Sequence, residues 1–599
     1  MKRTHTCGDL GIKEDGKEVT LQGWVDTRRD HGGLIFVDLR DRYGLTQIVL
    51  DPNSKGFGEA AQLRREDCIQ ITGKVRPRPQ GMANENLKTG KIEVYVAKEL
   101  IILNKSETPP IEIDDRKLAN EEVRMKYRFL DLRRPSMQKK LILRHKVGQA
   151  VRNYLSDNDF IEVETPLLVR ATPEGARDYL VPSRVHPGKF YALPQSPQLY
   201  KQLLMVAGMD RYFQLAKCLR DEDLRADRQP EFTQIDIEMS FLDEEDIYRL
   251  MEGLIKVAFK TADIDVKIPF KRIAYDEAME RYGSDKPDVR FGLELVNVSD
   301  IVKASNFEVF TKAIASGGKV KCINAKGCAK FSRTDIEDLT AFVAIYKAKG
   351  LAWAKINDAG KMESSIVKFF SDKVQADIVK KTDAKKGDLL LFVADHKHFT
   401  VNDALGNLRL KLAEKLNLIK KDEFNFIWVV DFPLLDFDED MQRHVSVHHP
   451  FTCPKDEDIK FLDKEPGKVK AKAYDLTLNG VEIGGGSIRI HKKELQEKIF
   501  KTLSISKEEA ERKFGFLLDA FRYGAPPHGG LAFGFDRLIA LICGTSDIRE
   551  VIAFPKNKAA EGPMDGCPSD VDPDQVKELH IKMEIKSKAV NPKGAELSK

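Results

Sequence analysis

The stretch at 211–242 constrains the fold most, because two strand-like patterns enclose a run of charged residues. Its first part is apolar and aromatic, and its second part alternates apolar with polar side chains, which predicts two paired strands. A charged hairpin is usually a solvated loop. Here Asp236 and Glu238 stand inside the second strand, so we expect a cavity lined with charge. Arg220 and Arg228, in the connecting loop, suit an anionic substrate.

Composition limits the remaining classes of protein. A chain of 599 residues is expected to form several domains, and a net charge of +4 means that any contact with nucleic acid must use local basic patches. The sequence has neither a run of about eighteen apolar residues nor an apolar export segment at its start. We therefore expect a cytoplasmic protein without a membrane partner. The spacing of Cys322 and Cys328 argues against a zinc site.

The first part of the chain, residues 1–108, has the pattern of a small β-barrel. Five short runs separated by turn residues fit a barrel of the OB type, which often binds nucleic acid. Ile35, Val37 and Leu39 share one face of the second run. Phe36 lies on the other face, where an aromatic ring suits stacking on a base, although a lone outward Phe is common. The predicted strands are residues 19–25, 34–39, 45–50, 68–75 and 92–103.

Three segments, in chain order, resemble the signature motifs of the class II aminoacyl-tRNA synthetases. FIEVETP at 160–166 resembles motif 1, RDEDLRADRQPEF at 220–232 resembles motif 2, and GGLAFGFDRLIAL at 529–541 resembles motif 3. Any one of them alone would be weak evidence, whereas the three in order are strong. The resemblance covers nearly the whole chain and points to the bacterial-type aspartyl-tRNA synthetases of subclass b. It implies a homodimer, because motif 1 builds the interface in this class.

The expected fold class is α+β and multidomain, with an OB-type barrel, an antiparallel-sheet catalytic domain with flanking helices, and an inserted α/β domain. The insertion resembles that of the bacterial enzymes, and its lysine-rich sequence contains no catalytic constellation. The apolar spacing at 141–156 predicts the first helix of the catalytic domain. The expected divisions are an anticodon-binding barrel at 1–108, a hinge with a short helix at 109–140, catalytic segments at 141–285 and 421–560, the insertion at 286–420 and a C-terminal extension at 561–599.

The resemblance implies ATP-dependent ligation of L-aspartate to tRNA(Asp) through an aspartyl-adenylate. Arg220 would bridge the α-phosphate and the substrate carboxylate, Arg537 would hold the γ-phosphate, and Phe232 would stack on adenine. Such a reaction asks little covalent chemistry of the protein, so positioning and electrostatics should supply most of the rate. The further ATP-binding residues implied are Asp221, Glu222, Arg228, Gln229, Glu482, Gly534, Phe535 and Asp536.

The same resemblance implies an amino-acid pocket and a magnesium site. Lys201 and Arg489 supply two cations for the side-chain carboxylate of aspartate. A buried cation that lacks its anion is costly, so this pocket should reject asparagine. The family pattern places Asp475 and Glu482 at Mg²⁺, which carboxylates bind well. The remaining aspartate contacts implied are Glu174, Gln198, Arg220, Asp236 and His448, with His449 as the alternative to His448.

The barrel would read the tRNA anticodon by this resemblance. His31 and Gly81 resemble residues of family members that also charge tRNA(Asn), although both could be plain loop residues. The alternatives are an asparaginyl- or lysyl-tRNA synthetase, which Lys201 disfavours, and a non-catalytic RNA-binding paralogue. A paralogue would be expected to have lost Arg220, Arg537 or the metal acids, and this chain retains them. The anticodon contacts implied are Arg29, Phe36, Gln47 and Glu93.

Overall fold

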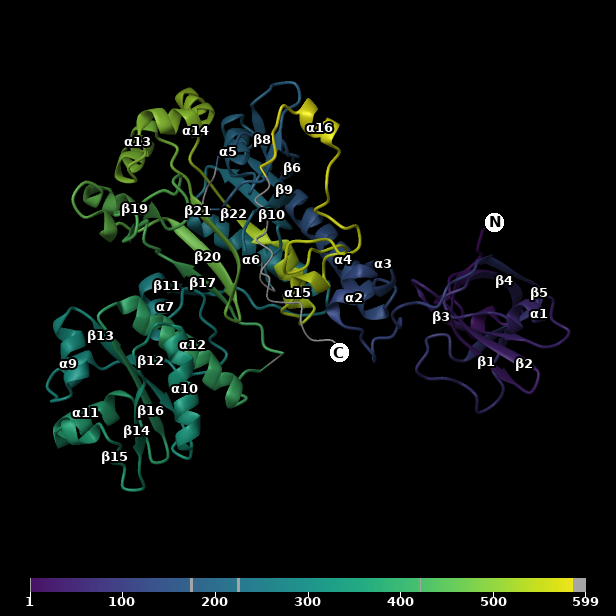
Figure 1. The fold of residues 1–599 in the computed structure, drawn as a ribbon, viewed down its shortest axis with the longest axis horizontal. Coiled ribbons are helices and arrows are strands. Elements are labelled where there is room, and N and C mark those ends of the chain that lie inside the picture. Colours follow the sequence, from purple (N-terminus) through teal and green to yellow (C-terminus); the bar gives the residue numbers. More distant parts are fainter. Residues whose placement is uncertain (1, 173–175, 224–226, 421, 585–599) are drawn as a thin grey trace, which may run out of the picture. The chain divides into compact units, whose positions relative to one another are not determined.

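The computed structural model describes residues 2–172, 176–223, 227–420 and 422–584. Within them the chain forms two compact units (Figure 1). The first unit draws its described residues from 1–145, 224–229 and 543–571, and the second from 146–223, 230–542 and 572–599. Among the described residues, no helix has both the length and the apolar character needed to cross a bilayer.

The first unit contains a closed five-stranded barrel in the order β1-β2-β3-β5-β4, which confirms the predicted OB-type architecture. Each predicted run is a strand, because alternation puts one set of apolar side chains inside the barrel. Ile35, Val37 and Leu39 are fully buried, whereas Phe36 is half-buried on the other face. The strands are β1 (Glu18–His31), β2 (Leu34–Asp41), β3 (Gly44–Leu50), β4 (Cys68–Pro77) and β5 (Ile92–Asn104), with α1 (Phe57–Ala61) after β3.

The segment predicted as a hinge with a short helix contains two short helices and the start of a third. It holds α2 (Glu121–Lys126), α3 (Arg128–Asp131) and the start of α4 (Pro135–Ser156), which begins earlier than the predicted Leu141. Arg128 donates to the carbonyls of Arg549 and Ile552 at 2.6 and 2.9 Å, so its buried charge fastens this segment to the C-terminal part of the first unit.

The second unit is built on an eight-stranded sheet in the order β11-β17-β20-β21-β22-β10-β9-β6. Neighbours are antiparallel except for the outermost pairs, β11–β17 and β6–β9, which confirms the predicted antiparallel-sheet domain. The strands are β6 (Ile161–Glu162), β9 (Arg211–Leu219), β10 (Glu231–Ser240), β11 (Lys271–Ala274), β17 (Phe426–Val430), β20 (Ala473–Leu478), β21 (Val481–Ile488) and β22 (His528–Gly534).

Helices and two small hairpins surround this sheet. The hairpins pair β7 (Leu180–Pro182) with β8 (Phe190–Ala192) and β18 (Leu435–Asp438) with β19 (Arg443–Ser446). The helices are α5 (Gln198–Val206), α6 (Glu244–Lys260), α7 (Tyr275–Tyr282), α13 (Lys493–Thr502), α14 (Lys507–Ala520), α15 (Phe535–Ile542) and α16 (Pro573–Glu578). Short 3₁₀ helices lie at Ile12–Glu14, Val367–Phe369, Asp456–Phe461, Pro466–Lys468, Phe521–Tyr523 and Ile548–Glu550.

An α/β insertion interrupts the sheet between β11 and β17, as predicted. Its five-stranded sheet, in the order β12-β13-β16-β14-β15, has α10 and α12 on one side and α9 and α11 on the other (Figure 1). The ends of the insertion meet, because Arg290 donates to the carbonyl of Lys420 at 3.2 Å. The elements are β12 (Leu295–Asn297), α8 (Ser299–Val302), α9 (Glu308–Ala315), β13 (Lys319–Ala325), α10 (Arg333–Ile345), β14 (Ala352–Ile356), β15 (Met362–Glu363), α11 (Asp372–Lys381), β16 (Leu389–Asp395) and α12 (His398–Lys415).

Candidate functional site

Four buried charges join α5, β10 and the end of β21. Lys201 Nζ lies 2.8 Å from Asp236 Oδ1 and 3.3 Å from Glu238 Oε2. The guanidinium of Arg489 donates from Nε and Nη2 to the two oxygens of Glu238, at 2.9 and 3.0 Å. None of the four side chains is more than 2% exposed. The charges that the sequence places in the second strand are therefore buried and paired with cations from elsewhere in the second unit.

Two glycines make room for carboxylates on neighbouring strands. Gly530 of β22 pairs with Glu238 of β10, and a β-carbon at Gly530 would lie only 2.1 Å from Glu238 Oε2. Gly485 of β21 pairs with Asp475 of β20, and its β-carbon would lie 2.3 Å from Asp475 Oδ1. Any larger residue would push the carboxylate away, so glycine at these positions fixes where both acids lie.

The pKa values of the two acids of β10 are shifted in opposite directions. Burial opposes charge on both, but Arg489 and Lys201 outweigh it at Glu238 and lower the pKa of its carboxyl. At Asp236, burial prevails over Lys201 and raises the pKa. Among the described residues, Asp236 Oδ2 and Gln198 Nε2 are buried without a hydrogen-bond partner, which is costly unless a ligand completes them.

The cations of this pocket are already neutralised, which corrects the premise that the pocket leaves a buried cation without its anion. Lys201 has both Asp236 and Glu238, and Arg489 has Glu238. The expected rejection of asparagine would therefore depend on the positions of these groups rather than on an unpaired cation. A fixed array of paired charges can still discriminate, because a neutral amide cannot accept from both cations as a carboxylate does.

Two adjacent histidines have different partners. His449 Nε2 accepts a hydrogen bond from Arg489 Nη1 at 2.6 Å, since a guanidinium only donates. Burial and, to a smaller extent, the positive charge of Arg489 lower the pKa of His449 well below its ordinary value, so the ring is neutral. His448 Nε2 lies 3.4 Å from Asp475 Oδ1, and there the carboxylate outweighs burial and raises the pKa of His448. His449 is therefore the histidine that contacts Arg489, whereas His448 lies beside Asp475.

Asp475 and Glu482 come from the adjacent strands β20 and β21. Burial and the Asp475 carboxylate raise the pKa of Glu482, so the two acids are close enough to repel each other. Arg537 Nη1 donates to the backbone carbonyl of Glu482 at 2.9 Å. The structure therefore brings together the two predicted metal ligands and the predicted γ-phosphate cation.

The motif 2 residues lie where β9 ends and β10 begins, beside the loop that joins the two strands. The Arg220 guanidinium lies over the ring of Phe232, 5.1 Å from its centroid, and Arg220 Nε is buried without a hydrogen-bond partner among the described residues. The backbone N–H of Asp221 donates to the carbonyl of Arg177 at 3.1 Å, and Glu222 is half-buried. A guanidinium that lies over an aromatic ring and keeps an unused N–H suits a purine nucleotide, because the ring can stack on the base and the N–H can donate to a phosphate oxygen.

Two motif 3 residues serve the interior of the domain. Asp536 Oδ2 accepts from the backbone N–H of Thr233 at 2.7 Å and so fastens α15 to β10 beside Phe232. The ring of Phe535 is buried, and its Cζ would lie 3.5 Å from a β-carbon on Gly148 of α4. Gly534, the last residue of β22, lies next to Arg537.

Two further predicted residues, Gln229 and Arg228, belong to the first unit. Gln229 exchanges hydrogen bonds with the backbone of Lys556, at 3.1 and 2.8 Å, within the first unit. Arg228, also in the first unit, is exposed. Glu174 lies outside the described residues.

The predicted anticodon residues Arg29, Gln47 and Glu93 form one connected hydrogen-bonded group in the barrel, in which Gln47 and Glu93 are buried. Arg29 donates to Asp38 at 2.9 Å, and Gln47 Nε2 donates to Glu93 at 2.9 Å. Arg29 is also paired across β1–β2 with Phe36. His31 packs edge-on against Phe36, with the ring centroids 5.9 Å apart. Gly81 lies in the loop after β4 with φ +83° and open space around it.

Sequence reasoning did not assign Glu238 or His528 to the site. His528 of β22 lies 3.2 Å from Gln202 of α5, so the helix that carries Lys201 is also tied to the motif 3 strand. Glu238 was visible only as a charge in an alternating strand, and its partners come from distant segments. The signal that could have found it is its place two residues after Asp236, on the same face of β10.

Comparison with known proteins agrees with this geometry. The family model described as tRNA synthetases class II (D, K and N) matches residues 120–558, and that of the OB-fold nucleic acid binding domain matches residues 19–102. An aspartate–tRNA(Asp/Asn) ligase of Heliobacterium modesticaldum is 57% identical over 98% of this chain and 97% of its own length. An aspartate–tRNA ligase of Ruminiclostridium cellulolyticum is 57% identical over 97% of this chain and 98% of its own length.

Solved structures share the fold. The asparaginyl-tRNA synthetase of Pyrococcus horikoshii complexed with asparaginyl-adenylate superimposes with a TM-score of 0.58, covering 93% of this chain and 98% of its own, at 21% identity. Three findings agree on the family of this chain. The barrel carries a connected polar group, the three motifs lie on one sheet, and the family model matches most of the chain. This chain belongs to the class II tRNA synthetases of the D, K and N group.

Proposed function

We propose that this protein ligates L-aspartate to tRNA(Asp), and also to tRNA(Asn), through an aspartyl-adenylate. The observation that carries the proposal is the buried array of Lys201, Asp236, Glu238 and Arg489 in a chain of this family. The names of the two relatives, each 57% identical, support aspartate as the amino acid. Protein synthesis takes place in the cytoplasm, where we place the enzyme.

The amino-acid pocket would recognise aspartate by its charges at both ends. Arg489 would hold the side-chain carboxylate through the second N–H of Nη2, because its other donors face Glu238, His449 and Ser487. Lys201 would exchange its 3.4 Å contact with the carbonyl of Ile237 for the substrate. The buried Oδ2 of Asp236 and Nε2 of Gln198 would be satisfied by the substrate, with Glu174 at the α-amino end. The neutral His449 fixes the Arg489 guanidinium in place without adding charge.

Adenylate formation would then depend on how the chain aligns the substrate carboxylate with the α-phosphate. Arg220 stabilises the charge that develops there, and Phe232 positions the adenine ring by stacking. Arg537, oriented by the Glu482 carbonyl, would hold the γ-phosphate so that pyrophosphate leaves in line. Asp536 keeps β10 and α15 in register while this happens.

The residues at Asp475 and Glu482 fit magnesium. They are two oxygen-donor side chains, and burial together with the charge of Asp475 raises the pKa of Glu482, which a bound cation would offset. Among the described residues, no group of three or more acidic, His or Cys side chains is gathered for a metal, so phosphate oxygens and water would complete the shell. Bound there, the ion would neutralise the β- and γ-phosphates.

The barrel would select the tRNA. Phe36 offers a face for stacking, and the bonded side chains Arg29, Gln47 and Glu93 offer fixed donors and acceptors for anticodon bases. We infer acceptance of tRNA(Asn) from His31, which packs on Phe36, and from the small Gly81.

We also propose that the enzyme is a homodimer through motif 1. Ile161, Leu167 and Leu168 are 50%, 53% and 53% exposed, and β6 is an edge strand of the large sheet. Exposed apolar side chains beside an edge strand suit burial by a second copy. Sedimentation of the wild type and of Pro166→Ala tests this, and a monomeric wild type contradicts it.

The functional proposal is tested by charging purified tRNA(Asp) and tRNA(Asn) with radiolabelled aspartate, side by side. We expect both to be charged, and a His31→Leu, Gly81→Lys double variant to lose tRNA(Asn) while keeping tRNA(Asp). A lysine at φ +83° is strained, by about 1–2 kcal/mol, so His31→Leu alone is the variant that keeps the test interpretable if the double variant fails to fold. If the wild type charges tRNA(Asp) alone, the proposal that it also charges tRNA(Asn) is wrong. If it charges neither tRNA, the whole functional proposal is wrong.

A further inference from the structure

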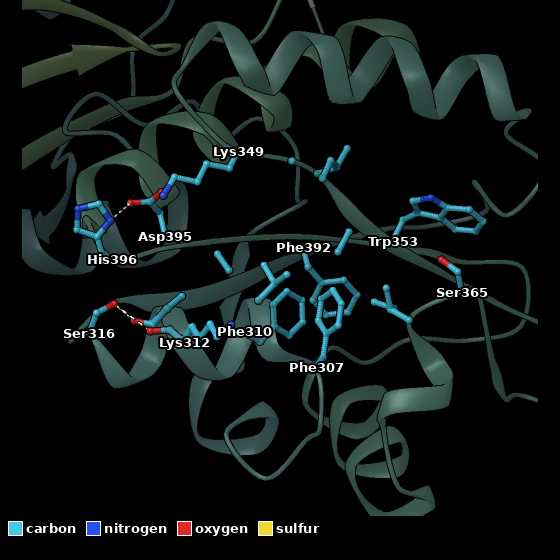
Figure 2. A pocket seen from close by; sticks show the side chains of 17 residues that line it. Phe307, Phe310, Lys312, Ser316, Lys349, Trp353, Ser365, Phe392, Asp395 and His396 are labelled. Carbon is cyan, nitrogen blue, oxygen red and sulfur yellow. Dashed lines mark hydrogen bonds and ion pairs between the residues drawn. The ribbon is translucent and has the colours of Figure 1, made fainter.

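The inserted domain contains a cavity that the proposed aminoacylation does not use. It has a volume of about 620 Å³ and lies between α9, β14 and the end of β16. Figure 2 shows three aromatic rings, those of Phe307, Phe310 and Phe392, gathered at its centre. The figure places Lys349 with Asp395 at one end, and Trp353 with Ser365 at the other.

The floor of the cavity is rigid and apolar. Phe310 and Phe392 are buried, and their ring centroids lie 5.9 Å apart. Phe307 packs edge-on against Phe310 at 4.8 Å, and Ile366 and Leu351 continue the apolar wall. These side chains belong to the core under the sheet, so the cavity is preformed rather than opened by a ligand. Volume and lining are those of sites for small apolar molecules.

The charged side chains that line the cavity are two lysines, Lys312 and Lys349, and one aspartate, Asp395. Asp395 Oδ1 accepts from the N–H of Lys397 at 2.9 Å and lies 2.9 Å from His396 Nδ1. Lys312 donates to Glu308 at 2.6 Å. Lys349, in contrast, is an exposed lining residue without a hydrogen bond or ion pair to any other part of the chain that the structure describes.

We propose that this cavity binds a small molecule with an apolar body and a single anionic head group. The aromatic floor would cover the apolar body, and the ammonium of Lys349 would pair with the head group at the mouth. A cationic amphiphile would meet Lys349 as a like charge, and a neutral one would gain nothing from it. Aliphatic and aromatic monoanions share this chemistry, and paired probes tell them apart.

The first experiment measures binding of three probes of equal chain length by isothermal titration calorimetry on the whole protein. The probes are dodecanoate, dodecanol and dodecyltrimethylammonium, each below its micelle concentration. We expect saturable binding of one dodecanoate per chain, about three- to fivefold tighter than the other two, as one rim ion pair allows. Naphthalene-2-carboxylate, run in parallel, shows whether an aromatic monoanion binds better than the aliphatic one.

Two variants locate the site. Lys349→Gln is expected to weaken dodecanoate about three- to fivefold and to leave dodecanol unchanged. The matched control Lys373→Gln removes an equally exposed lysine of the same domain that does not line the cavity, and should change neither. Ala352→Phe places a ring in the cavity and should abolish binding. Thermal unfolding of each variant shows that it is folded.

Several results would overturn the proposal. They are binding that does not saturate, equal affinity for the cationic probe, or dodecanoate affinity unchanged in Lys349→Gln. If Ala352→Phe fails to fold, the lysine pair still decides, because both changes are at exposed positions. Aminoacylation plays no part in these measurements, so a failure here and a failure of the proposed function are distinguishable.

Discussion

The carboxylate of Glu238 occupies the space that a side chain at Gly530 would need. The two residues are directly paired on β10 and β22, and a β-carbon at Gly530 would lie 2.1 Å from Glu238 Oε2. Glu238 in turn holds Arg489 by two hydrogen bonds. A backbone position of motif 3 thereby fixes the direction of a cation in the amino-acid pocket.

A β-carbon at Gly530 would also lie 2.1 Å from the backbone carbonyl oxygen of Ile237, so we expect Gly530→Ala to shift β10 together with Glu238 and to leave Arg489 misdirected. Disturbing a buried charge pair costs about 3–5 kcal/mol, so kcat/KM for aspartate should fall by a hundredfold or more in ATP–pyrophosphate exchange. Gly467→Ala is the control, because nothing lies within 4 Å of a β-carbon there. Near-normal exchange by Gly530→Ala would show that Glu238 does not direct the pocket.

Arg489→Lys tests whether the planar guanidinium is needed. Lysine cannot make two parallel hydrogen bonds to Glu238 while also reaching His449, so the charge is kept but the geometry is lost. We expect kcat/KM for aspartate to fall by two orders of magnitude or more, from a loss of about 3 kcal/mol. Arg333→Lys, at a side chain that is 94% exposed, should have no effect. Equal activity of the two variants would contradict the proposed role of Arg489.

The contact between Glu280 and Lys321 predicts a pH dependence of stability. Burial opposes ionisation of Glu280, but Lys321 and Lys319 outweigh it and lower the pKa of Glu280 to about 2. The stabilisation is fully present above the ordinary value of 4.5 and is lost as the pH falls through the folded value of about 2. Because 40% of the Glu280 side chain is exposed, screening leaves about 1 kcal/mol.

Glu280→Gln should accordingly unfold at lower urea concentration than the wild type at pH 6, and the difference should shrink between pH 4 and pH 3. Glu337→Gln, which removes the partner of Arg333 in an exposed pair, serves as control and should change little at any pH. A difference between Glu280→Gln and the wild type that stays constant from pH 6 to pH 3 would rule out ionisation of Glu280 as its source.

Phe36→Leu separates tRNA recognition from adenylate formation. Loss of base stacking costs about 1–3 kcal/mol, so KM for tRNA(Asp) should rise about five- to a hundredfold. Amino-acid activation without tRNA should be unchanged, because Phe36 belongs to the barrel. Phe399→Leu, at an exposed phenylalanine outside the barrel, is the control. An equal rise in both variants would mean that Phe36 has no special contact.

Local patterns predicted much of the fold, because alternation and turn residues carry their own signal. The barrel strands and the β9–β10 pair lie where alternation placed them. The start of α4 was missed, since residues 135–140 are mostly polar and show no apolar period, although Pro135 is a favourable first helical residue. In the site, Lys201 and Asp236 could be named from motifs.

The partners of those residues could not be predicted, because they depend on long-range register. Glu238 meets Arg489 only through the order β21-β22-β10, and His449 reaches Arg489 from a loop after β19. Phe535 and Asp536 lie in motif 3, but which face of α15 is turned inward is decided by packing against α4 and β10. Motif spacing carries no information on that choice.

The meeting of Arg290 and Lys420 has a consequence for how the large sheet can form. β11 and β17 are neighbours, yet the whole insertion separates them along the chain. Once the insertion has folded, its two ends are held together, so the sheet joins β11 to β17 across a short gap. Even for a flexible connection, each doubling of length costs only about 0.6 kcal/mol of closure entropy. The large sheet can therefore accommodate the insertion between β11 and β17 at a small cost in free energy.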